Sequence, residues 1–88
     1  IIVDNGIYVS PNPMSNNAEI GFTLKQSSFV TIEIVNILGE KVATVFDNQL
    51  DAGYKAMYVS TETMSAGSYY INIRTAQGSA STPITIIK

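Results

Sequence analysis

Apolar and polar residues alternate in several short segments of this chain, and the clearest of these segments spans residues 18–25. Its alternate positions are apolar, and the positions between them are small or polar. The apolar set is Ala18, Ile20, Phe22 and Leu24. A period of two residues is typical of a β-strand with one face in the core and the other in water. The segment is therefore predicted to be a half-buried strand.

Six further segments carry strand signals, and no segment holds a convincing 3.6-residue helical period. In residues 41–46 the inward face stays open, because Val42, Val45 and Phe46 do not share one parity. The seven predicted strands cover about residues 6–9, 18–25, 29–37, 41–46, 54–59, 68–75 and 81–87. Strand signals that recur about every 10 residues favour a sandwich or a barrel. Seven strands in 88 residues predict an all-β fold, namely an immunoglobulin-like antiparallel β-sandwich.

The alternation also predicts which side chains face the core. The inward set is Val30, Ile32, Ile34, Met57, Val59, Tyr69, Ile71, Ile73, Ile84 and Ile86. Phe29 and Val35 break the alternation of the third strand, so that strand is expected to be central or covered on both faces. Tyr69 opens the sixth strand, where such sandwiches often place a corner tyrosine. Pro83 cannot donate to a β-ladder, so the last strand is expected to start at a sheet edge.

Turn residues separate the strands. Pro11 and Pro13 stop the first strand, and Gly39 allows a tight connection between the third and fourth strands. We expect a polar loop over residues 47–53, a helical or 3₁₀ turn within residues 61–66, and a hairpin turn over residues 76–78.

Length and composition indicate one domain over residues 1–88, with residues 1–5 forming the end of an upstream linker. The chain begins without an initiator methionine or a leader pattern, so it is expected to be a piece of a longer protein. It has no run of 18 apolar residues, and a transmembrane segment is not predicted. Cysteine is absent, so the core must hold without disulfides.

Candidate chemistry is sparse. The chain has no histidine, which removes the usual general base and the commonest transition-metal ligand. Glu19 and Glu33 fall on the outward faces of ordinary strands, away from any pocket that would shift a pKa toward neutrality. We predict neither enzymatic activity nor a cofactor. The five basic residues are dispersed along the chain, which argues against a nucleic-acid partner.

Two weaker binding sites stay open. Asp47, Asn48 and Asp51 offer oxygen ligands of the kind that calcium prefers, although their spacing does not match an EF-hand, and they equally suit a solvated turn. Tyr54 and Tyr58 project from one side of a strand, about 13 Å apart. Exposed aromatic rings at that spacing could stack on a polysaccharide, or they could pack against a neighbouring domain.

Five short motifs occur in order along the chain, and each falls at a turn or within a strand. They are Pro11-Asn12-Pro13, Leu38-Gly39 with Val42, Ala52-Gly53, Gly67 with Tyr69, and the closing Ile84, Ile86, Ile87 and Lys88. Each motif alone is ordinary turn or strand chemistry. Together, over residues 7–88, they resemble the C-terminal sorting domain of proteins exported by the bacterial type IX secretion system. Ser10 departs from the aromatic residue common there, and Pro83 interrupts the final strand.

The resemblance implies a non-catalytic C-terminal signal that directs a cargo protein across the outer membrane in Bacteroidetes-type bacteria. The implied partners are the outer-membrane translocon, a sortase that cleaves the signal and attaches the cargo to the surface, and an upstream cargo domain. The implied location is secreted or cell-surface, reached via the periplasm. The implied sorting and partner-binding residues are Pro11, Asn12, Pro13, Leu38, Gly39, Gly67, Tyr69, Ile86 and Lys88.

Two other classes of function stay open beside the sorting signal. One is an immunoglobulin-like spacer or assembly domain of a multidomain extracellular protein, which could be followed by more chain. The other is a carbohydrate-binding module, which requires the outward tyrosines to be solvent-exposed and coplanar.

Overall fold

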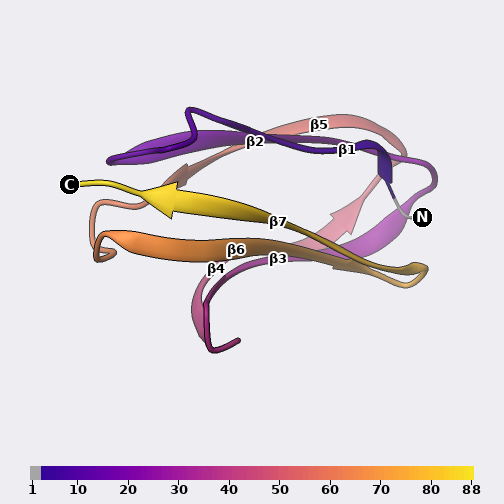
Figure 1. Cartoon of the computed structure of the whole chain (residues 1–88). Coiled ribbons are helices and arrows are strands. Elements are labelled where there is room, and N and C mark those ends of the chain that lie inside the picture. The colour runs from indigo at the N-terminus through magenta and orange to yellow at the C-terminus, as the bar shows by residue number, and fades with distance from the viewer. Residues whose placement is uncertain (1–2) are drawn as a thin grey trace.

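The computed structural model describes residues 3–88, and this part of the chain consists of seven β-strands joined by short turns (Figure 1). The strands are β1 (Val3–Ser10), β2 (Asn17–Leu24), β3 (Ser28–Asn36), β4 (Lys41–Leu50), β5 (Gly53–Ser60), β6 (Gly67–Thr75) and β7 (Gly78–Ile86). The expected all-β fold is thereby confirmed. Over the same residues there is no helix of the length and apolarity needed to span a membrane.

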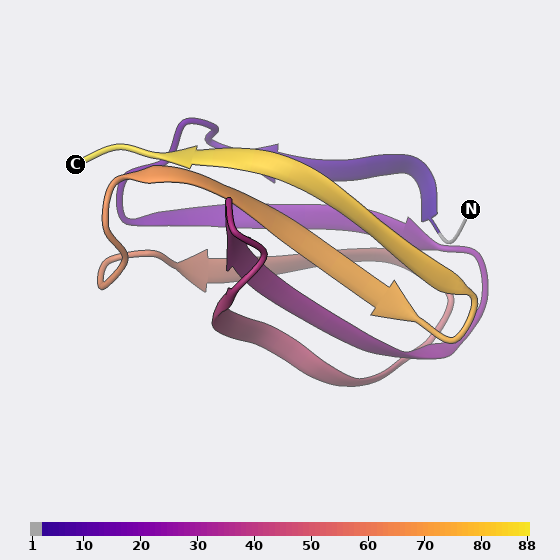
Figure 2. The same ribbon diagram turned by 60° about the horizontal axis from the view of Figure 1, so that its bottom comes forward.

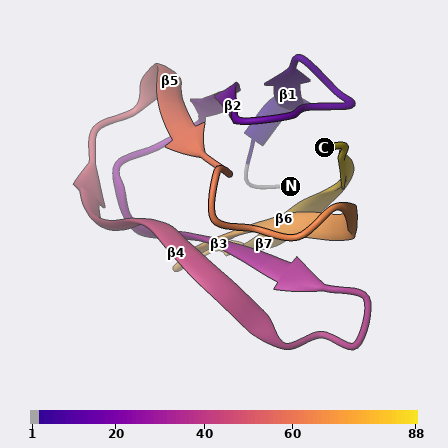
Figure 3. The same cartoon turned by 90° about the vertical axis from the view of Figure 1, so that its left-hand side faces the viewer.

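The strands form two antiparallel sheets that face each other (Figures 2 and 3). One sheet has three strands in the order β1-β2-β5, and the other has four in the order β4-β3-β6-β7. The chain changes sheet between β2 and β3, between β4 and β5, and between β5 and β6. This division into three and four strands, with crossovers at the ends, matches the expected immunoglobulin-like sandwich.

The core lies between the sheets and contains the residues that the alternation predicted. Ile32 and Ile34 of β3 and Ile71 and Ile73 of β6 are fully buried, as is Ile20 of β2 in the opposite sheet. Burial of one such side chain stabilises the fold by about 1.5–3 kcal/mol. Every buried polar side-chain atom within residues 6–88 has a hydrogen-bond partner, so this part of the core carries no uncompensated polar group.

β3 is central in its sheet, as expected from its broken alternation. It pairs with β4 on one side and β6 on the other, and Val35 is almost completely buried on the outward face. Phe29 is about half exposed at the other end of the same strand. β7 lies at the edge of the sheet, which agrees with the position expected for Pro83.

The prediction of a polar loop over residues 47–53 is wrong, because β4 continues as a strand to Leu50. Asp47, Asn48 and Gln49 pair with Thr31, Val30 and Phe29 of β3. On the side of β3 that faces away from β6, its backbone groups offer partners to these residues. Polar side chains are tolerated in β4 because it is an edge strand of the sheet. Pairing therefore outweighs the low intrinsic strand propensity of this segment.

Three other boundaries differ from the expectation. β1 begins at Val3, so the backbone of residues 3–5 is strand and not linker, while the linker expected at residues 1 and 2 lies outside the described residues. β7 begins at Gly78, the last residue of the expected hairpin turn, and not at residue 81. Residues 61–66 form a hydrogen-bonded turn, closed by Met64 N donating to the Thr61 carbonyl (3.1 Å), without a helix.

Candidate functional site

The Pro11-Asn12-Pro13 segment lies against the outer edge of β7, on the side away from β6 (Figures 1 and 2). Both prolines follow cis peptide bonds. The Asn12 amide behaves like a short piece of neighbouring strand, because its Oδ1 accepts from Thr85 N (3.1 Å) and its Nδ2 donates to the Pro83 carbonyl (3.3 Å). Asn12 thus satisfies backbone groups that an edge strand would otherwise leave to solvent.

Met14 continues the contact with β7 by its backbone. Met14 N donates to the Thr85 carbonyl (2.9 Å), and Ile87 N donates to the Met14 carbonyl (2.7 Å), which makes a parallel bridge beside Ile86. The Met14 side chain is completely buried in the core. The segment between β1 and β2 therefore closes one side of the sandwich with its backbone and fills the interior with one side chain.

Lys88 ties the last residue to the turn between β5 and β6. Its Nζ donates to the carbonyls of Thr61 (2.9 Å) and Glu62 (3.3 Å). Thr61 is completely buried, donates from Oγ1 to the Ser15 carbonyl (3.1 Å), and donates from its backbone N to the Asn16 carbonyl (2.7 Å). Three segments that are distant in sequence, around residues 15, 61 and 88, are thereby joined at one end of the sandwich.

Gly67 and Tyr69 start β6 at this same end. Gly67 has φ +153° and is paired with Ile86 of β7. The Tyr69 ring packs against the core, and its hydroxyl donates to the Ser65 carbonyl (2.7 Å), four residues upstream. This is the geometry of the corner tyrosine found in immunoglobulin-like sandwiches, so the role expected for Tyr69 is present.

Leu38 and Gly39 form a second, separate feature, the turn between β3 and β4. In Figure 3 this turn projects beyond the two layers, away from the C-terminus. Asn36 organises it, since Oδ1 accepts from Leu38 N (2.9 Å) and Glu40 N (3.0 Å) while Nδ2 donates to Glu40 Oε1 (2.9 Å). Gly39 has φ +85°, which favours glycine. Leu38 is 79% exposed, so a rigid turn presents an aliphatic side chain to solvent.

The structure thus divides the motif residues into two groups. The larger group meets at one end of the sandwich and consists of Pro11, Asn12, Pro13, Gly67, Tyr69, Ile86 and Lys88. The smaller group, Leu38 and Gly39, occupies the β3–β4 turn. Met14, Asn36 and Thr61 serve these arrangements but were not singled out from the sequence. For Asn36, an asparagine at the start of a tight glycine turn is the usual signal for such side-chain bonding.

The region around Asp47 does not gather ligands for a cation. Asp47 and Asn48 are successive residues of β4 and so point to opposite faces of the sheet. Asp47 Oδ1 accepts from Thr31 Oγ1 (2.9 Å), and Asn48 Oδ1 accepts from Gln49 N (2.7 Å). Among the side chains that the structure describes, those of residues 6–88, no three acidic groups lie close enough together to hold a metal ion.

Asn12→Ala tests the closure of the β7 edge. The change removes two hydrogen bonds, each worth about 0.5–1.5 kcal/mol, and it leaves the proline backbone unchanged. We expect the free energy of unfolding to fall by about 1–2 kcal/mol and the Tm by about 5–15 °C. Thermal unfolding followed by circular dichroism measures the change.

Asn48→Ala is the matched control, because the Asn48 side chain is exposed on β4 and its Oδ1 accepts a hydrogen bond from the adjacent residue, Gln49. We expect it to change stability by less than about 0.5 kcal/mol. Equal stability of Asn12→Ala and Asn48→Ala would contradict the closing role of Asn12.

The fold and these contacts define a class of protein, a small all-β sandwich with a filled apolar core. Its motif residues build the turns, the tyrosine corner and the contacts along the outer edge of β7. The family model described as "Secretion system C-terminal sorting domain" matches residues 6–88. The chain therefore belongs to the family of type IX secretion C-terminal sorting domains, as its motifs indicated. No curated protein matches the chain.

Family membership also defines the function in outline. The domain is a sorting signal for type IX secretion, and it belongs to an exported protein whose cargo part it serves. Interaction with the secretion machinery follows from that role.

Proposed function

We propose that the domain is a non-catalytic address label, read in the periplasm by the outer-membrane translocon of the type IX system, which then exports the attached cargo. In this proposal a sortase removes the label and attaches the cargo to the cell surface. An immunoglobulin-like spacer is the alternative. The match over residues 6–88 to a sorting-domain family favours the label.

The observation that carries the proposal is the structural role of the motif residues. They build backbone closures and turns, and they do not converge on a pocket. Asn12 bonds to the backbone of β7, Lys88 bonds to the turn after β5, and Tyr69 bonds to Ser65. Such an arrangement gives a surface of fixed shape and no reactive group, which is what a receptor-read label requires.

We place the docking surface on β6, β7 and the bend at residues 11–13. The β7 backbone groups of residues 83, 85 and 87 on the outer edge are already occupied by Asn12 and Met14 or lack a proton, as at Pro83. A partner is therefore not expected to add a strand along the part of this edge from residue 83 to residue 87. Recognition is expected to use exposed side chains instead, among them Ile87, which is 52% exposed, and Lys88.

A reporter fusion tests both the label and its docking surface. Residues 1–88 are fused to the C-terminus of a periplasmic fluorescent protein, in a host that carries the type IX machinery. We expect fluorescence at the surface or in the medium from the parent fusion, and retention in the periplasm for the double variant Ile87→Ser/Lys88→Gln. Both changed side chains are exposed and follow the last residue of β7, so the core and the strands are left intact. Lys88→Gln also removes the two hydrogen bonds from Nζ to the turn after β5, each worth about 0.5–1.5 kcal/mol, so the variant is expected to be folded but less stable than the parent.

The control is Phe29→Ser, which removes an exposed aromatic residue near the other end of the same sheet and should be exported like the parent. Retention of the parent fusion in the periplasm would overturn the label and favour the spacer. Export of the Ile87→Ser/Lys88→Gln variant at the parental level would overturn the docking surface alone. Circular dichroism of each purified domain separates loss of docking from loss of folding.

A further inference from the structure

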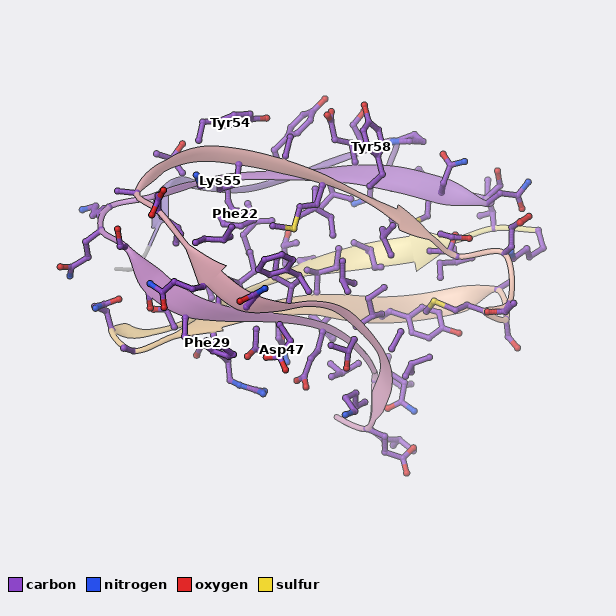
Figure 4. The ribbon with its side chains drawn as sticks, turned by 180° about the vertical axis from the view of Figure 1, so that it is seen from behind. Phe22, Phe29, Asp47, Tyr54, Lys55 and Tyr58 are labelled. Atoms are coloured by element: carbon purple, nitrogen blue, oxygen red, sulfur yellow. The ribbon has the colours of Figure 1, made fainter. Side chains whose placement is uncertain are left out.

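The outer face of the three-stranded sheet carries an array of exposed tyrosines. Tyr8 is on β1, and Tyr54 and Tyr58 are on β5, with 55%, 63% and 80% of their surfaces exposed. Figure 4 shows Tyr54 and Tyr58 on the outer side of this sheet, away from the four-stranded sheet. Solvent-exposed aromatic side chains from two different strands thus share one face of the sandwich.

Gly21 forms the floor between these rings. It lies in the middle strand β2, directly between Tyr8 of β1 and Ala56 of β5. Although it faces outward, Gly21 is buried. A Cβ atom placed there would lie 2.5 Å from the Tyr54 hydroxyl oxygen and 3.4 Å from Tyr8 Cδ2, so both rings reach over this position. The absence of a side chain at residue 21 lets Tyr54 lean across the sheet toward Tyr8.

Tyr54 therefore rests on the sheet while more than half of its surface stays open to solvent. Tyr54 is paired with Thr23 of β2, and its side chain extends to Gly21, the next residue of β2 that faces the same way. Tyr8 stands on the other side of the same glycine. The rings of Tyr8 and Tyr54 thus approach the same position on β2, and Tyr58 lies farther along β5 on the same face, beyond Ala56. We call this surface the tyrosine platform and define it as Tyr8, Tyr54 and Tyr58 with Gly21 and Ala56 as its floor.

Polar groups border the platform on the same face. Glu19 is paired with both Ser10 and Tyr58, and Thr23 is paired with Tyr54. Glu19, Ser10 and Thr23 add one carboxylate and two hydroxyl groups to the tyrosine hydroxyls. By contrast, the most exposed aliphatic side chains, Ile37 and Leu38, lie on the β3–β4 turn of the other sheet. The platform therefore combines aromatic faces with hydroxyl and carboxylate groups, and the single methyl group of Ala56 is the exposed aliphatic group among its members.

We propose that the tyrosine platform binds a neutral polysaccharide chain. The C–H faces of pyranose rings are apolar and stack on aromatic rings, while their hydroxyl groups radiate at the edges and need donors and acceptors. Flat open rings above a glycine floor, bordered by Glu19, Ser10 and Thr23, supply both kinds of contact. A protein partner of ordinary composition would favour aliphatic contacts as well, and of these the platform offers only the methyl group of Ala56.

The chain offers a variant that changes the platform without removing a ring. Gly21→Ala places a methyl group against the far end of the Tyr54 side chain, which can swing away from the sheet. The strand itself tolerates alanine, so the fold should be retained. Tyr54→Ala removes the ring, and Tyr54→Phe retains it without the hydroxyl. Tyr70→Ala is the matched control, because Tyr70 is an exposed tyrosine of the four-stranded sheet.

Affinity electrophoresis in native gels tests the proposal with laminarin, xylan, galactomannan and hydroxyethylcellulose as probes. We expect at least one polysaccharide to retard the parent domain and Tyr70→Ala. Gly21→Ala and Tyr54→Ala should lose at least tenfold in affinity for that polysaccharide, whereas Tyr54→Phe should keep most of it. Thermal unfolding confirms that each variant is folded.

Three results would overturn the proposal. One is parental mobility in all four gels. Another is equal retardation of the parent and Tyr54→Ala. The third is a dimer of the parent domain in sedimentation equilibrium that Tyr54→Ala dissociates, because this would assign the platform to a second copy of the chain. None of them bears on export, which the reporter fusion measures separately.

Discussion

Ile32→Asp is expected to leave the domain unfolded at 25 °C. Ile32 is completely buried at the centre of β3, between Phe46 of β4 and Ile73 of β6. A carboxylate there would lose its hydration without a partner, at a cost of several kcal/mol, in addition to the lost apolar burial. Domains of this size have total stabilities of about 5–15 kcal/mol, so the change removes most or all of the margin.

Phe29→Asp is the control for this experiment, because it puts the same charge on the same strand at a residue that is 53% exposed. We expect it to be soluble and to unfold cooperatively in urea. Far-ultraviolet circular dichroism and urea titration compare the two variants. A folded Ile32→Asp domain would show that the inward face of β3 has been assigned incorrectly.

Met14→Ala is expected to have the second largest effect. The Met14 side chain is 0% exposed and packs in the main core cluster, although it follows a proline bend outside the strands. Truncation of a buried methionine to alanine costs about 2–5 kcal/mol. For a domain of this length the Tm should fall by roughly 10–30 °C. Differential scanning calorimetry measures the shift.

The backbone bridge between Met14 and β7 does not depend on the side chain, so Met14→Leu is a useful companion. A volume-conserving apolar exchange usually costs less than about 1.5 kcal/mol. We expect Met14→Leu to stay close to the parent. If Met14→Ala were as stable as Met14→Leu, the bend would not be anchored in the core.

Much of the fold could be predicted from the period of two in the strands. Ile20 and Phe22 in β2, Ile32 in β3 and Ile71 in β6 are all buried as expected. A side chain that alternates across a pleated sheet has only two possible faces, so its environment follows directly from parity. Tyr69 was also placed correctly, because its position after a glycine at the start of a strand is a local signal.

Features that depend on distant partners could not be predicted in the same way. β4 extends through Asp47, Asn48 and Gln49 because β3 pairs with them, and nothing in that polar segment itself favours a strand. The burial of Met14 depends on β7, which is far away in the sequence. The role of Gly21 likewise depends on Tyr8 and Tyr54, which belong to two other strands.

The two hydrogen bonds of Asn12 join residues that are 71 and 73 positions apart in the chain. The edge that they seal can form only after synthesis has passed Thr85, so a polypeptide interrupted earlier would emerge with this side of the sandwich open. Any receptor that requires the sealed form would then reject prematurely terminated products. The same asparagine that holds two segments together would thereby report that synthesis had reached β7.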